Sequence, residues 1–101
     1  TPFDVHLICV NANSETVVKK SEELYEQLQT QGISVLYDDR SNVSPGFKFK
    51  DADLLGMPLQ VVVGEKNMKN NHIEFKIRNT NERRMVLVED SVNEVVKFVK
   101  E

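Results

Sequence analysis

The sequence has very little cysteine: Cys9 stands alone among 101 residues. A single cysteine excludes a disulfide within the chain and a zinc site built from several thiolates, and it fits a reducing compartment. No apolar run approaches the roughly 20 residues that a membrane-spanning helix needs. No N-terminal stretch has the pattern of a signal peptide. We therefore expect a cytoplasmic protein that does not contact a membrane.

The sequence also lacks an excess of positive charge. Its 13 Lys and Arg residues are outnumbered by 16 Asp and Glu residues, which gives a formal net charge of −3. Free-standing nucleic-acid binders are usually basic overall. Any contact with RNA must therefore come from a local patch of this chain.

Repeats, low-complexity tracts and linkers are absent as well, and 40% of the residues are hydrophobic, a normal globular value. A chain of this length is large enough for one hydrophobic core. We therefore expect a single domain that spans residues 1–101.

Alternating stretches of apolar residues and turn residues predict the elements of an α/β fold. The segment LICV at residues 7–10 is continuously apolar, as in a strand that is buried on both faces. Gly32 is the expected end of a first helix, and Pro45 and Gly56 delimit a second. The predicted elements are strand 3–10, helix 15–31, strand 33–37, helix 45–55, strand 59–63, strand 72–78, strand 84–88 and a helix from residue 90 or 91 onward.

The order of these elements, βαβαβββα, predicts a three-layer α/β/α architecture with a mixed five-stranded sheet. Strand–helix–strand units form right-handed parallel crossovers. The strictly alternating HIEFKIR at residues 72–78 predicts a half-buried strand, paired in a hairpin with the strand that follows. Residues 64–71 are predicted to form a polar turn.

No constellation in the sequence specifies a reaction. It contains neither a glycine-rich phosphate loop nor a nucleophile elbow. The two histidines lack metal-ligand spacing, and Cys9 lies in a predicted buried strand, where a cysteine is usually an apolar filler. Asp38 and Asp39 could form a paired-carboxylate site. Adjacent acids after a strand more often bond to the turn or to a neighbour such as Arg40.

The exposed face of the strand at residues 72–78 carries Glu74, Lys76 and Arg78. Lys and Arg can donate to the O6 and N7 atoms of a guanine. A carboxylate can accept from the N1–H and N2–H₂ groups of the same base. Such a face could read an unpaired guanine, because sequence-specific RNA recognition usually targets unpaired bases. The alternative, which this segment alone favours, is the solvated outer face of a hairpin.

Further cations lie in the predicted loops and in the second helix. Arg40, Lys48 and Lys50 follow the second strand, and Lys66 and Lys69 precede the fourth. These side chains could contact phosphates. The alternative for each of them is an ordinary surface position.

Residues 38–58, DDRSNVSPGFKFKDADLLGMP, resemble a segment of prolyl-tRNA synthetase anticodon-binding domains. That segment has an Asp-Asp-Arg loop, then Pro-Gly-x-Lys-Phe, an Asp-Ala-Asp/Glu-Leu helix and Gly-x-Pro. The stretches PFDVHLICVN, LQVVVG and IEFKIR also resemble the bacterial form, so the resemblance covers essentially the whole chain. The matching positions of the first segment are Asp38, Asp39, Arg40, Pro45, Gly46, Lys48, Phe49, Asp51, Ala52, Asp53, Leu54, Gly56 and Pro58.

The resemblance implies the fold of class II aminoacyl-tRNA synthetase anticodon-binding domains and a role in binding proline-specific tRNA. This domain would be the C-terminal module of a larger, homodimeric ligase. The ligase would attach proline to its tRNA, using ATP and magnesium in a catalytic domain outside this chain. The module itself would hold no cofactor and catalyse nothing, and it would read the two guanines that end proline anticodons. The residues that the resemblance assigns to anticodon contact are Arg40, Lys48, Glu74, Lys76 and Arg78, with Lys50 and Lys66 as further candidates.

Some features depart from the family pattern or suggest structural roles. Ile77 stands where some members have an acidic residue, and the loop at residues 41–44 is uncharged. Gly46 and Gly56 are expected to serve backbone geometry, and Phe49 and Leu54 are expected to pack. Asp51 and Asp53 are expected to cap the helix, pair with a neighbour or order the loop. Three alternatives stay open: the corresponding domain of a threonyl-, histidyl- or glycyl-tRNA synthetase, an accessory or dimerisation module of the same fold, and a small enzyme.

Overall fold

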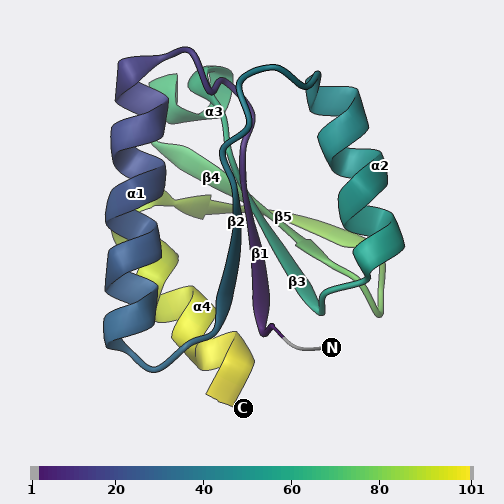
Figure 1. Cartoon of the computed structure of the whole chain (residues 1–101). Coiled ribbons are helices and arrows are strands. Elements are labelled where there is room, and N and C mark those ends of the chain that lie inside the picture. The colour runs from purple at the N-terminus through teal and green to yellow at the C-terminus, as the bar shows by residue number, and fades with distance from the viewer. Residues whose placement is uncertain (1–2, 101) are drawn as a thin grey trace.

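The computed structural model describes residues 3–100, which form a five-stranded sheet with helices on both faces (Figure 1). The strands lie in the order β2-β1-β3-β4-β5. β1 pairs in parallel with β2 and β3, and β4 pairs antiparallel with β3 and β5. The elements are β1 (Val5–Cys9), α1 (Glu15–Thr30), β2 (Val35–Asp38), α2 (Pro45–Leu55), β3 (Leu59–Val63), α3 (Glu65–Lys69), β4 (His72–Ile77), β5 (Glu82–Leu87), a 3₁₀ turn (Val88–Asp90) and α4 (Ser91–Lys100).

The two faces of the sheet are covered unequally. α1 and α4 lie on one face, and α2 lies on the other (Figure 1). The main core fills the space under α1 and α4 and includes buried residues from all five strands. The cluster under α2 is much smaller and contains Ile8, Ala52 and Val62, with Val10 and Phe49 partly buried beside it. α2 is therefore held on the sheet by little apolar contact.

Local sequence signals set the limits of α2. Pro45 occupies the first turn, where its missing N–H is not needed. The Phe47 backbone N–H donates to Ser44 Oγ at 3.2 Å, which caps the N-terminus. Gly56 ends the helix in the left-handed region, at φ 67°, and its N–H donates to the Ala52 carbonyl at 3.0 Å. The predicted bounds of this helix, 45–55, are confirmed.

The mixed five-stranded sheet and the three layers are confirmed, with corrections to single elements. Residues 64–71 were predicted as a turn, but they contain the short helix α3, so the order is βαβαβαββα apart from the 3₁₀ turn. The sequence of α3, EKNMK, gives a single helical turn with too few apolar residues for a periodic signal. β5 begins at Glu82 rather than Arg84. Leu54 was expected to pack, but 81% of its surface is exposed.

None of the helices within residues 3–100 is both long and apolar enough to cross a membrane.

The prediction that Cys9 lies in a buried strand is confirmed, because Cys9 is fully buried in β1. Burial raises the pKa of its thiol, which disfavours the reactive thiolate.

We expect Gly56→Ala to destabilise the protein. An alanine at this φ is strained by roughly 1–2 kcal/mol. A Cβ at this position would also lie 3.0 Å from the guanidinium carbon of Arg78. The measurement is the free energy of unfolding in urea. Gly46→Ala is the matched control, because Gly46 lies inside α2 with open space around it and alanine favours helix by about 0.5–1 kcal/mol. Equal losses in both variants would contradict the explanation.

Candidate nucleic-acid interface

The alternation predicted for β4 is confirmed by the structure. Ile73, Phe75 and Ile77 are buried in the main core, whereas Glu74 and Lys76 face the α2 side and are partly exposed. Glu74 and Lys76 therefore lie on a part of the sheet beside α2 that no helix of the described residues covers completely.

Arg78 follows directly after β4 and extends this row. Its backbone N–H donates to the Pro58 carbonyl at 3.1 Å. Its guanidinium lies against Gly56 at the C-terminal end of α2, where the helix dipole favours a positive charge. The three predicted residues of the row, Glu74, Lys76 and Arg78, are thus brought to the same side of the sheet.

A second carboxylate, from α2, reaches the same row. Asp53 Oδ1 accepts from Lys76 Nζ at 3.3 Å and from Gln60 Nε2 at 3.2 Å. The hydrogen bond from Gln60, followed by that from Lys76, lowers the pKa of Asp53, so this carboxylate is ionised at neutral pH. Its side chain remains 57% exposed, which leaves it free to accept further hydrogen bonds.

Sequence reasoning missed Asp53 and Gln60 as part of this site. One signal was present, because Gln60 interrupts the otherwise apolar strand LQVVV. A polar side chain that is 4% exposed in a central strand needs a partner. Gln60 finds it in Asp53 through Nε2, while its Oε1 has no hydrogen-bond partner within the described residues. The direction in which Asp53 points from α2 could not be read from its spacing alone.

A pocket of about 510 Å³ opens beside Glu74, between α2 and the start of α3. Phe49 and Val62 contribute apolar surface to it, and Glu74 and Lys66 contribute charge. An aromatic wall with a carboxylate at its edge suits an unpaired base, since single-stranded RNA is recognised by stacking and by hydrogen bonds to base edges. The pocket therefore extends the Glu74 row toward Lys66.

Lys48 does not reach this surface, and the prediction that it contacts RNA is corrected. Its side chain is 1% exposed, and its Nζ donates to the Cys9 carbonyl at 2.7 Å. β1 and β2 are paired only as far as Ile8 and Asp38, so Cys9 lies one residue beyond the ladder. Cys9 still pairs with Val63 of β3, so Lys48 supplies a hydrogen-bond donor where β2 no longer does, and it ties α2 to β1.

Arg40 is partly exposed, but most of its hydrogen-bonding capacity is used within the protein. Its Nε and Nη2 donate to the two carboxylate oxygens of Asp38 at 2.9 and 2.8 Å. Nη2 also donates to Asp51 Oδ2 at 3.1 Å, and the guanidinium lies 5.6 Å from the centre of the Phe47 ring. Two carboxylates compensate the charge of Arg40, which weakens its attraction to a phosphate. The expected pairing of Asp38 with Arg40 is confirmed.

Lys50 and Lys66 are both exposed, on α2 and α3 respectively. Neither forms a hydrogen bond or an ion pair with another residue in the range 3–100. Lys66 also lines the pocket beside Glu74. Both lysines are therefore available for contact with an anion.

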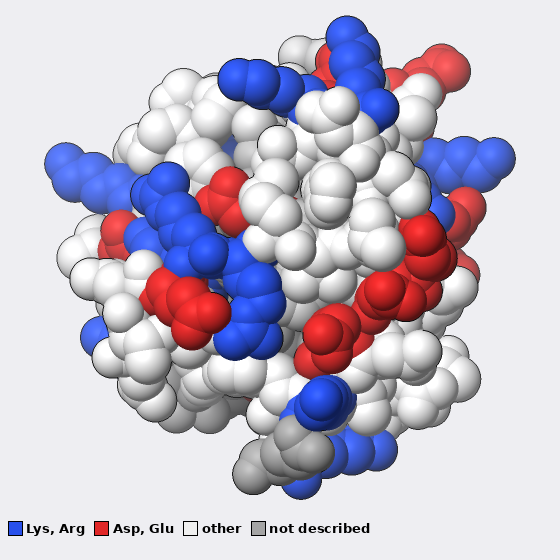
Figure 2. Space-filling view, turned by 180° about the vertical axis from the view of Figure 1, so that it is seen from behind, with Lys and Arg blue, Asp and Glu red and all other residues white. Residues whose placement is uncertain are grey.

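The charges of the molecule are segregated despite the negative total. The view from behind, from the side of β4 and β5, shows a band of Lys and Arg with a few acidic residues beside it (Figure 2). A separate row of Asp and Glu lies on the other side of this view, and uncharged surface separates the two. On the α2 side of the sheet, the β4–β5 hairpin contributes Lys76 and Arg83, and Arg78 follows directly after β4. A local basic patch is thus compatible with a net charge of −3.

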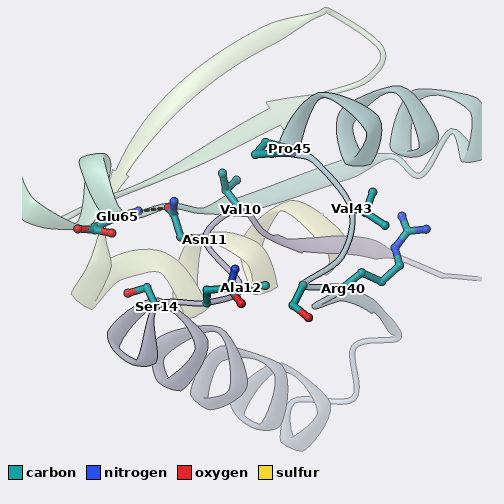
Figure 3. Close-up of a pocket in the computed structure, with 10 residues that line it drawn as sticks. Val10, Asn11, Ala12, Ser14, Arg40, Val43, Pro45 and Glu65 are labelled. Atoms are coloured by element: carbon teal, nitrogen blue, oxygen red, sulfur yellow. Dashed lines mark hydrogen bonds between the residues drawn. The ribbon is translucent and has the colours of Figure 1, made fainter.

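A different pocket lies where the β1–α1 and β2–α2 loops diverge to opposite faces of the sheet (Figure 3). Parallel sheets often bind ligands at such a point. Here Asn11 Oδ1 accepts from the Glu65 N–H at 2.7 Å, and Arg40 is engaged by Asp38 and Asp51. The lining includes neither histidine nor cysteine. No group of three or more potential metal ligands occurs among residues 3–100. The pocket therefore specifies no catalytic chemistry.

Comparison with known proteins points to tRNA-related relatives. A family profile described as "Anticodon binding domain" matches residues 4–101. The chain is 39% identical to the proline–tRNA ligase of Pelobacter propionicus over 100 residues, which cover 99% of this chain and 17% of that protein. It is 43% identical to the proline–tRNA ligase of Thermodesulfovibrio yellowstonii over 103 residues, which cover 95% of this chain and 18% of that protein. The chain thus spans about a sixth of the length of these relatives.

We expect Lys48→Met to destabilise the fold by about 1–3 kcal/mol, because the Cys9 carbonyl would lose a buried, charged donor. Methionine keeps most of the aliphatic stem, so the loss isolates the hydrogen bond. The measurement is chemical denaturation at neutral pH. Lys50→Met is the control, because Lys50 is exposed two residues away and should change stability by at most about 0.5 kcal/mol. A neutral effect at Lys48 would refute its structural role.

We also expect Arg40→Gln to destabilise the protein in a pH-dependent way. Burial opposes ionisation of Asp38, but the hydrogen bonds from Arg40 outweigh burial and lower the pKa of this carboxyl. A lowered folded-state pKa contributes stability at neutral pH, and this contribution is lost as the pH falls through and below about 4, where aspartates titrate. The difference in melting temperature between the two proteins should therefore be largest at neutral pH and shrink in acid. Arg84→Gln, which removes an exposed ion pair with Glu82, should show little effect.

Proposed function

The chain belongs to the anticodon-binding domain family, and from that premise we propose that it is the tRNA-recognition module of a proline–tRNA ligase. In this proposal the module reads the two guanines of the proline anticodon on the open sheet face beside α2. The same face could not be assigned to RNA from its charges alone, because polar outer faces of hairpins are common.

One observation carries the proposal: two carboxylates, one from β4 and one from α2, stand on the same open face beside cations. Glu74 lies at the edge of the pocket that Phe49 and Val62 line. Asp53 lies beside Lys76, at 3.3 Å. A carboxylate can accept both the N1–H and the N2–H₂ of a guanine, which no other standard base offers as a pair. Two such groups suit two guanines.

The spacing of the row also suits two neighbouring bases. Glu74 and Lys76 are two residues apart on one strand, which corresponds to about 6.8 Å. Two splayed bases of consecutive nucleotides can lie side by side on such a row. In this arrangement one guanine stacks in the pocket beside Phe49 and donates to Glu74. The other guanine donates to Asp53, while Lys76 or Arg78 donates to the O6 and N7 atoms of this base.

The remaining cations contribute to affinity in different ways. Lys50 and Lys66 are exposed and without protein partners among residues 3–100, so they serve as phosphate contacts that orient the RNA. Arg40 and Lys48 act mainly through α2: they hold the helix that carries Phe49 and Asp53. Arg40 retains partial exposure and contributes at most a weak contact.

The proposal extends to the longer protein of which such modules form a part. The chain spans 17% and 18% of the two relatives described above, both of them proline–tRNA ligases. We propose that the catalytic domain of the parent enzyme binds ATP and magnesium, that the parent is a homodimer, and that it acts in the cytoplasm. The module by itself supplies recognition and no chemistry.

The proposed function is tested by fluorescence anisotropy with a labelled proline anticodon stem-loop. A second stem-loop, in which other bases replace the two guanines, is measured beside it across a salt series. We expect tighter binding to the guanine form and a steep loss of affinity with salt, because phosphate contacts release counterions. Equal binding to both stem-loops would reject base reading, and absence of binding at low salt would reject RNA recognition by this chain.

Glu74→Gln and Lys76→Met should each reduce binding to the guanine stem-loop by about 1–3 kcal/mol. Each should also reduce the difference between the guanine and replaced stem-loops, since a base contact contributes only when the base is present. Arg84→Met is the matched control, because Arg84 is the cross-strand partner of Phe75 on the opposite face of the sheet. Loss of affinity for both stem-loops by the same factor would leave Glu74 and Lys76 only a phosphate or structural role.

A further inference from the structure

β5 carries a part of the open face that the two proposed guanine sites leave unused. Its residue register places Met85 opposite Glu74 and Arg83 opposite Lys76, so all four side chains lie on the same face. Leu87 continues this row opposite His72. Met85 is 49% exposed and Leu87 41% exposed. An apolar strip thus borders the charged residues directly.

We propose that Met85 and Leu87 form a stacking shelf for a third unpaired nucleotide, the first base of the anticodon, with its phosphate bound by Arg83. The proposal rests on the function proposed above, because the two guanines place the RNA strand on β4. It adds a subsite on β5 whose chemistry differs from theirs.

The position of the shelf fits the nucleotide next to a bound guanine. Neighbouring strands lie about 4.8 Å apart, and cross-strand partners on one face are in direct contact range. A base above Met85 therefore lies beside a base held by Glu74, within reach of the adjacent nucleotide of the same strand. The shelf is continuous with the proposed interface rather than a separate surface.

The chemistry of the shelf fits a base that is not read. A leucine side chain has no hydrogen-bonding group, and a thioether is only a weak acceptor. Contact between such side chains and the flat face of a base tolerates any base, because every base has a π-face. Proline codons differ in their third base, so the first anticodon base differs among proline tRNAs while the two guanines stay the same. A shelf without hydrogen-bonding side chains accepts all of these tRNAs.

The charge beside the shelf supports an RNA occupant over a protein one. Arg83 is exposed. Its charge helps to lower the pKa of Asp53, but its guanidinium forms no hydrogen bond or ion pair with the residues of the range 3–100. Its neighbour Arg84 differs, because Glu82 pairs with it at 3.0 Å. An exposed guanidinium without an ion-pair partner, at the end of an apolar shelf, matches a nucleotide, which presents a base and a phosphate together.

The test is a double-mutant comparison between Met85 and the first anticodon base. The guanine stem-loop is prepared with each of the four bases at that position and with an abasic site there. Binding is measured for the unaltered protein, Met85→Ala and Leu54→Ala. Leu54 is the control, because it is more exposed than Met85 but lies on α2. Thermal unfolding of each variant shows that the fold is kept.

We expect the abasic site to weaken binding by the unaltered protein and by Leu54→Ala by about tenfold, in the range measured for base stacking. For Met85→Ala, the abasic site should weaken binding of the stem-loop by less than about twofold. Exchange among the four bases should change affinity by less than about threefold. A second variant, Leu87→Ala, should show a smaller loss in the same direction as Met85→Ala.

Two outcomes overturn the inference while the proposed function stands. In the first, the unaltered protein prefers the guanine stem-loop, but the abasic site weakens binding by unaltered protein and Met85→Ala alike. In the second, the abasic site has no effect on either protein. If the unaltered protein fails to prefer the guanine stem-loop at all, the proposed function fails and the shelf fails with it. The guanine comparison therefore separates the two failures.

Discussion

The candidate site depends on the polar contacts that hold α2 against the sheet. Among residues 3–100, the apolar cluster beneath α2 contains three fully or nearly buried residues, far fewer than the core beneath α1 and α4. Polar contacts compensate. Lys48 donates to the Cys9 carbonyl inside the protein, and Arg40 joins Asp38 at the end of β2 to Asp51 on α2. Asp53 on α2 also accepts hydrogen bonds from Gln60 and Lys76. Because Phe49 and Asp53 both come from α2, these contacts determine where both lie relative to β4. A buried charged hydrogen bond is costly to break, so the position of the helix is well defined.

The elements of the fold were predictable because their signals are local, whereas the geometry of the site was not. Proline and glycine delimit α2, and strict alternation identifies β4, so both follow from short stretches of sequence. α3 was missed because one helical turn is too short to show a period. The burial of Lys48 was missed for another reason. Its partner is a backbone carbonyl 39 residues earlier in the chain, and no spacing within α2 encodes that contact.

The net charge did not predict the binding surface, because several charged side chains are buried or paired with other residues of the protein. Arg40 is compensated by two carboxylates and Lys48 is buried, so two of the predicted contacts offer little to RNA. Conversely, Asp53 enters the site although its motif suggested a structural role. Its exposure leaves it able to bond a ligand while Lys76 and Gln60 orient it. A count of charges ignores which side chains already have partners, and that distinction determines the binding surface.

The open face also divides into a strand that carries charged side chains, β4, and a strand that carries exposed apolar ones, β5. On β4, Glu74 and Lys76 present charged groups, and their place in a rigid sheet keeps the spacing of those groups fixed. On β5, the same face presents Met85 and Leu87, whose side chains offer contact area without directional bonds. The proposed recognition of two bases, beside a third base that is not recognised, requires this difference between neighbouring strands. Since cross-strand register is set by the hairpin itself, one hairpin would present both kinds of surface to the RNA strand of the proposed complex.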